Sequence, residues 1–181
     1  MITLKAIEFH WVEGIDDDAL DQCAHGRVCF EIDDVIFVRP EDGVWTVSGA
    51  GLFLLRTIQH EHTANHSVAE HNFLFPCCAH SCWAVGEGEF KLICMGCNSG
   101  IDLEVKHFGT SVEIGVRDGK RAIVQAPVWQ AAVFQFADQV RAFYDQSAAK
   151  AVPDDVPDKE GWAAFWNEWY SRRFGPNSRA S

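Results

Sequence analysis

The sequence predicts a mixed α+β fold, in which an antiparallel β-meander sheet is combined with one helix near residues 48–60 and two C-terminal amphipathic, aromatic-rich helices packed on it. Three observations predict this class. The chain has 181 residues, the length of one domain, and 48% of them are apolar. The spacing of apolar residues also changes along the chain between a period of two and a helical period. We expect a single domain over 1–175 and a frayed tail over 176–181.

Alternation of apolar and polar residues predicts the strands. It begins at 28–33, and the apolar run 35–38 follows and ends at a Pro-Glu-Asp-Gly turn sequence. Further along, turn signals at 108–109 and 118–119 separate short β-like runs, which is typical of an antiparallel meander. The strands expected there are 82–85, 90–94, 101–105, 112–116 and 122–124.

Helical spacing of apolar residues predicts three helices. Ser48 is placed to cap the first, near 48–60, and the second is expected from about 128 to 147. The third follows a polar linker, with Asp158 placed to cap it. We interpret the aromatic stripes as core, because each helix packed on a sheet needs one apolar face. The stripes include Trp129, Phe136, Phe143, Trp162, Phe165, Trp166 and Trp169.

Charge is unevenly distributed along the chain. The formal net charge is −11, of which −9 falls on residues 1–75 and −2 on residues 76–181. Such a field repels nucleic acid and anionic membrane and speeds encounter with a basic protein. We therefore expect a basic protein partner, no nucleic acid and no membrane, with Trp11 and Trp45 as exposed anchors. The acids expected to contact the partner are Asp16, Asp17, Asp18, Glu31, Glu41, Asp42, Asp154 and Asp155. In the alternative interpretation, these acids only keep the protein soluble.

Seven cysteines occur on a chain whose first residues are not those of an export signal, so we expect a cytoplasmic protein with reduced thiols. Cys94-x-x-Cys97 could place two thiolates on one zinc ion, completed from the segment Cys77-Cys78-Ala-His80-Ser-Cys82. The alternative function is thus a zinc-binding protein or metal-dependent hydrolase. Because buried cysteines are also common in strands, we expect no metal and no cofactor.

Enzymatic motifs have little support in the sequence. A nucleophile elbow and a glycine-rich phosphate loop are both absent. The run His60-Glu-His62-Thr-Ala-Asn-His66 lacks the His-Glu-x-x-His spacing of metalloproteases, and we interpret it as a solvated loop. We therefore expect a binding protein with no catalytic residues.

Three stretches carry a resemblance to a known group of proteins. The stretches are Gly96-Cys97-x-x-Gly100-Ile101-Asp102-x-x-Val105-x-His107, then Trp129-x-x-Ala132-Val133-x-x-Phe136-x-Asp138-x-Val140-x-x-Phe143-Tyr144-x-x-Ser147-x-x-Lys150, and Gly161-Trp162-x-x-Phe165-Trp166-x-Glu168-Trp169-x-x-Arg172-Arg173. Together they resemble immunity proteins of bacterial polymorphic-toxin and contact-dependent growth inhibition systems. The pattern covers about the last half of the chain.

This resemblance implies a cytoplasmic antidote that binds a cognate toxin domain, commonly a nuclease, and neutralises it by occluding its active site. It implies no catalytic residue. The toxin-binding residues expected here are therefore the acids named above, which come from the charge distribution alone. A remaining interpretation is a housekeeping scaffold whose aromatic stripes and acids serve only packing and solvation.

Overall fold

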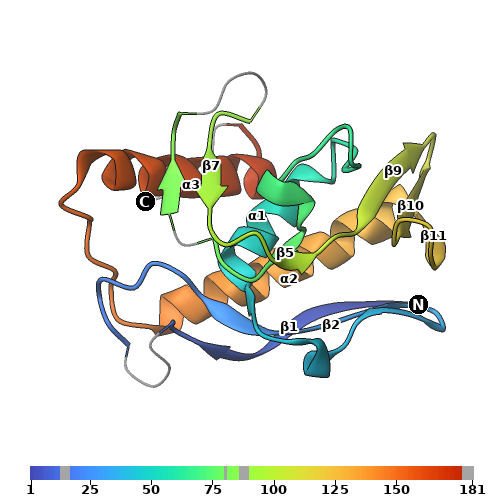
Figure 1. The fold of residues 1–181 in the computed structure, drawn as a ribbon, viewed down its shortest axis with the longest axis horizontal. Helices are drawn as coiled ribbons and strands as arrows, with labels where there is room; N and C mark the ends of the chain where they lie inside the picture. Colours follow the sequence, from blue (N-terminus) through green and yellow to red (C-terminus); the bar gives the residue numbers. More distant parts are fainter. Residues whose placement is uncertain (13–16, 80, 86–89, 177–181) are drawn as a thin grey trace.

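The computed structural model describes residues 1–12, 17–79, 81–85 and 90–176, and it confirms the mixed α+β class. Three helices, α1 (Val47–Arg56), α2 (Ala126–Gln146) and α3 (Val156–Phe174), pack among small antiparallel sheets. Helix α2 lies along strand β1 and also packs on α1, while α3 packs on strand β6 and on α1 (Figure 1). The two C-terminal helices are thus packed against sheets, as the sequence predicts.

The N-terminal sheet contains β1 (Ile2–His10), β2 (His25–Ile32), β3 (Val35–Val38) and the short β4 (Trp45–Thr46). Its order is β1-β2-β3, and β4 also pairs with β2. Every pairing is antiparallel, with Leu4 opposite Phe30. Apolar residues of β1 and β2 alternate into the core, so the alternation in the sequence correctly predicted β2 and β3.

The strands of the middle of the chain divide among three further sheets. Strands β9 (Glu104–Phe108), β10 (Ser111–Gly115) and β11 (Arg121–Gln125) form a three-stranded meander. Strand β5 (Phe75–Pro76) pairs with β8 (Gly100–Ile101), and β6 (Ser81–Trp83) pairs with β7 (Ile93–Met95). Two short 3-10 helices, η1 (Pro40–Asp42) and η2 (Glu70–Asn72), lie in the connections.

Three helix ends differ from the prediction. Helix α1 ends at Arg56 and not near residue 60, because the next amides, those of Ile58 and Gln59, donate to carbonyls three residues back and not four. Its N-cap is Thr46, not Ser48. Helix α3 is capped by Asp155, whose carboxylate accepts the amide of Asp158. This start of the helix is favoured because it places Pro157 in the first turn, where the missing backbone N–H of proline costs nothing.

Most residues of the aromatic stripes lie in the core, as predicted, and Phe143 and Trp166 are half-buried and pack against it. Trp129, Phe136, Phe165 and Trp169 are each at most 1% exposed. The two tryptophans predicted as exposed anchors are also buried, so that prediction is wrong. Trp11 packs on Phe143 and Tyr144 of α2, and Trp45 lies in β4 beside the first turn of α1; the two side chains are buried.

Candidate functional site

The structure separates the predicted acidic residues into two groups. Asp154 and Asp155 line a surface pocket, and Asp17 and Asp18 lie close to it through contacts with Lys150. Glu31 instead lies at the end of β2 in the N-terminal sheet, and Glu41 and Asp42 lie in η1, which connects β3 to β4 of that sheet. In Figure 1 the linker between α2 and α3 lies on the opposite side of the molecule from the start of β1. Glu31 lies opposite this start of β1 in the sheet. Asp16 lies outside the described residues.

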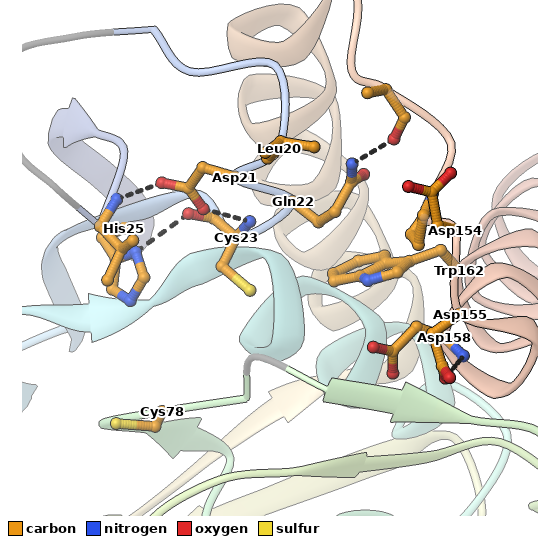
Figure 2. Close-up of a pocket in the computed structure, with 13 residues that line it drawn as sticks. Leu20, Asp21, Gln22, Cys23, His25, Cys78, Asp154, Asp155, Asp158 and Trp162 are labelled. Carbon is orange, nitrogen blue, oxygen red and sulfur yellow. Dashed lines mark hydrogen bonds between the residues drawn. The ribbon is translucent and has the colours of Figure 1, made fainter.

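The pocket has a volume of about 490 Å³ and is lined by Val12, by Cys78 and by three longer segments of the chain. These are residues 20–25 before and at the start of β2, the linker at 151–155, and the first turns of α3. Figure 2 shows Asp21 on one side, Asp154, Asp155 and Asp158 on the other, and the indole of Trp162 between them. Four carboxylates therefore surround a pocket that has an aromatic wall.

Hydrogen bonds hold three of these carboxylates in place. Asp158 accepts the indole N–H of Trp83 (2.8 Å), and Asp155 accepts the backbone amide of Asp158. Asp21 accepts the amide of Cys23 (2.9 Å) and also that of Val12. All of these donors are neutral, so the hydrogen bonds orient the carboxylates without pairing them to a positive charge.

The linker is tied to the loop before β2 by further hydrogen bonds. The amide of Ala151 donates to the carbonyl of Ala19, and the Gln22 side chain donates to the Ala151 carbonyl, both at 2.7 Å. The Tyr144 hydroxyl donates to the Gln22 carbonyl (2.6 Å). These bonds join the two walls of the pocket to the end of α2, so the pocket is formed before any ligand arrives.

Lys150 offsets part of the acidic charge beside the pocket. Its Nζ lies 2.6 Å from Asp17 Oδ1 and 3.2 Å from the centroid of the Trp11 ring. The hydrogen bond from Lys150 lowers the pKa of Asp17 below its usual value. Asp17 is therefore paired within the chain, whereas Asp154 and Asp155 are exposed at the pocket rim.

The cysteines predicted as zinc candidates also fall into two groups. Cys82 and Cys94 face each other across β6 and β7, with their Sγ atoms 2.9 Å apart, and both are buried. Cys78 and Cys97 instead come together with Cys77, and the three Sγ atoms all lie within 4.8 Å of one another. His80 lies outside the described residues.

Two of the clustered thiols, Cys97 and Cys77, have pKa values shifted in opposite directions. Hydrogen bonds from Cys78 lower the pKa of Cys97, with further contributions from the Cys77 thiol and from the Ser99 backbone. Desolvation raises the pKa of Cys77 to about 12. Cys97, which is exposed, therefore ionises more readily than Cys77.

The histidine-rich run after α1 is not wholly a solvated loop, which corrects the interpretation for His62. This residue is fully buried and exchanges both backbone hydrogen bonds with Val105 at 2.8 Å. Its Nδ1 accepts the amide of Val68 (3.1 Å). Burial lowers the pKa of His62, so its ring is held in the neutral form.

Sequence reasoning did not assign Asp21, Asp158 or Trp162 to a binding site. Asp21 was not among the predicted contacts, Asp158 was interpreted as a cap, and Trp162 was assigned wholly to the core. Trp162 is 6% exposed and belongs to both the core and the pocket wall. One local signal was present, the dense run of acids and prolines before α3.

The fold and this site define a mixed α+β protein with a preformed acidic pocket on its surface. No protein-family model, curated protein or solved structure matches the chain. Across the described residues, none of the helices is both long and apolar enough to cross a lipid bilayer.

Proposed function

We propose that the protein is a cytoplasmic immunity protein that binds a basic toxin domain through the acidic pocket and neutralises it by occluding its active site. The observation that carries the proposal is the arrangement of Asp21, Asp154, Asp155 and Asp158 around Trp162. The sequence resemblance to immunity proteins supports the same function. In this proposal the protein performs no chemistry of its own.

The pocket suits a cationic side chain of a partner. A lysine or arginine entering it meets carboxylates on both sides and the indole of Trp162. Charge-assisted hydrogen bonds and cation–π contact both favour such a group. Because Asp155 and Asp158 are already held by hydrogen bonds, little side-chain entropy is lost on binding.

Apolar side chains near the pocket supply the rest of a docking surface. Val12 and Leu20 line the pocket and are 58% and 73% exposed. Val152 and Val156, in the linker and at the start of α3, are 64% and 61% exposed. Protein interfaces commonly combine apolar and charged side chains, and this combination fits a protein partner better than a free ion.

A nuclease toxin is a physically suitable partner. A nuclease binds the phosphates of its substrate with basic side chains, so its active-site channel attracts an acidic surface. The net charge of −11 on this chain steers it toward such a channel and speeds association. Occupation of the channel then excludes the nucleic acid without any need for catalysis.

The proposal predicts that a basic toxin domain is encoded beside this gene, and co-expression with that domain tests it. Cells that express the toxin domain alone are expected to stop growing, and cells that also express this protein are expected to grow. The two proteins should then co-purify at a fixed stoichiometry. Growth arrest that persists despite folded protein, or rescue without a complex, would contradict the proposal.

A further inference from the structure

Three thiols from two separate parts of the chain converge beside the pocket. Cys77 and Cys78 follow β5, whereas Cys97 precedes β8, and their Sγ atoms all lie within 4.8 Å of one another. The Sγ atoms of Cys77 and Cys78 are 3.9 Å apart. Cys77 and Cys78 are neighbours in the chain, but Cys97 comes from a separate segment. The fold therefore brings the third thiol to the other two.

The backbone brings the two segments together. Strand β5 pairs with β8 through Phe75 opposite Ile101 and Pro76 opposite Gly100. The amide of Cys77 then donates to the carbonyl of Ser99 (2.9 Å), which extends the pairing to the cysteines. Since β5 and β8 are only two residues each, the cluster lies directly at the end of this small sheet.

Glycine at position 96 permits this close approach. A Cβ atom on Gly96 would overlap the carbonyl oxygen of Cys78. Any other residue would therefore push the segment that carries Cys97 away from the segment that carries Cys78. The sequence thus has a glycine at a place where the two thiol-bearing backbones lie in close contact.

A second contact fixes the Cys77 side of the cluster. The Thr46 hydroxyl donates to the carbonyl of Cys77 (3.0 Å), and Thr46 Oγ1 lies 3.2 Å from Nε2 of His25. Thr46 is fully buried, so this contact is shielded from water. Outer hydrogen bonds of this kind orient the groups that ligate a metal.

We propose that Cys77, Cys78 and Cys97 bind a zinc ion as three thiolate ligands, with the fourth position supplied from solvent. Zinc–thiolate bonds of about 2.3 Å in tetrahedral geometry place two sulfurs about 3.8 Å apart. The 3.9 Å between Cys77 and Cys78 already matches this separation. Cys97 is exposed, which leaves one side of the ion open to water.

Cys82 and Cys94 are not ligands of this site. Their thiols are 2.9 Å apart and buried between β6 and β7, and no third metal-ligating side chain joins them among the described residues. The proposed ligand set therefore differs from one built on the Cys94-x-x-Cys97 spacing. The proposed set contains only Cys97 of that motif. Zinc binding at this site does not depend on how a protein partner binds.

Zinc titration of the metal-free protein tests the site. The reduced full-length chain is titrated with Zn²⁺ in competition with a chromophoric chelator, and with Co²⁺ to detect thiolate-to-metal charge-transfer absorption. We expect one equivalent to bind, with the charge-transfer band of a three-thiolate complex. Cys97→Ser and Cys77→Ser should each weaken binding at least tenfold, whereas Cys29→Ser, on the outer side of β2, should not change it.

Two further variants separate ligand loss from loss of structure. Gly96→Ala keeps every thiol but displaces Cys97 from Cys78, so it should also weaken zinc binding. Cys82→Ala removes the buried pair and should leave the stoichiometry at one. Circular dichroism establishes that each variant is folded. Binding of less than a tenth of an equivalent by the folded wild-type protein, or equal affinity in Cys97→Ser, would overturn the proposal.

Discussion

The guanidinium of Arg56 is completely buried and lies 2.8 Å from the carboxylate of Glu168, which joins the end of α1 to α3. Its other N–H groups donate to the carbonyls of Val68 (2.7 Å) and Leu92 (2.9 Å). Glu168 lowers the cost of burying this charge, and the hydrogen bond from Arg56 helps to lower the pKa of Glu168 against the effect of its own burial. One side chain thus ties together four parts of the chain.

Removal of the Glu168 charge should destabilise the protein strongly. Glu168→Gln leaves the buried guanidinium without a counter-charge, so we expect the free energy of unfolding to fall by about 3 kcal/mol. Urea denaturation followed by tryptophan fluorescence measures this change. The control is Asp145→Asn, which breaks the exposed pair with Arg141 and should cost about 0.5 kcal/mol or less. Equal losses in the two variants would show that burial of the pair is unimportant.

The contact of α3 with β6 should not tolerate a methyl group. A Cβ on Gly161 would overlap the backbone carbonyl of Cys82, so Gly161→Ala must separate the helix from the strand. We expect a loss of about 2 kcal/mol, although alanine favours helix by about 1 kcal/mol on propensity alone. Ala163→Gly, at an exposed position of α3, is the control that measures the effect of helix propensity on stability without changing the contact with β6. A Gly161→Ala protein that is more stable than wild type in denaturant would contradict this close packing of α3 on β6.

Stability should decrease in mildly acidic solution because of His62. Burial lowers its pKa in the folded protein, whereas the unfolded chain takes up the proton near the usual value of 6.5. The unfolded state therefore binds more protons below about pH 6.5, and stability falls there by up to about 1.4 kcal/mol per pH unit. Asp102 and Glu104 oppose this shift but are outweighed by burial.

Thermal unfolding between about pH 7.5 and 5.5 measures this effect, a range that lies above the usual titration of carboxylates. His62→Asn removes the titrating group, so its melting temperature should depend less steeply on pH even if it is lower throughout. His66→Asn, at an exposed position nearby, is the matched control and should keep the wild-type slope. A slope unchanged in His62→Asn would exclude His62 as the cause.

Much of the fold could be predicted because its signals are local. The alternation over β2 and the helical spacing over α2 are properties of short windows, and both elements are found within about three residues of the expected bounds. Sheet membership is not local. Nothing in the sequence near Phe75 indicates that it pairs with Ile101, so the division of the strands into four sheets could not be deduced.

The candidate site was predicted only in part for the same reason. Asp154 and Asp155 stood out as a charge run, but Asp21 joins them only through hydrogen bonds between the linker and the loop before β2. Trp11 was expected at the surface because its partners, Phe143 and Tyr144, lie more than a hundred residues away. The position of Asp21 at the pocket and the burial of Trp11 both depend on contacts between residues far apart in the sequence, and the composition does not reveal such contacts.

The binding affinity for the cognate basic toxin domain, measured by calorimetry with two matched triple variants, tests the role of the pocket most directly. Asp154→Asn, Asp155→Asn and Asp158→Asn together remove three charges from the pocket while they keep the cap of α3 and the acceptor for Trp83. Glu31→Gln, Glu41→Gln and Asp42→Asn together remove three charges from the N-terminal sheet. We expect the pocket variant to bind at least about tenfold more weakly, a change of 1.4 kcal/mol, and the sheet variant to bind like wild type. Wild-type affinity in the folded pocket variant, or an equal loss in the sheet variant, would contradict binding through the pocket.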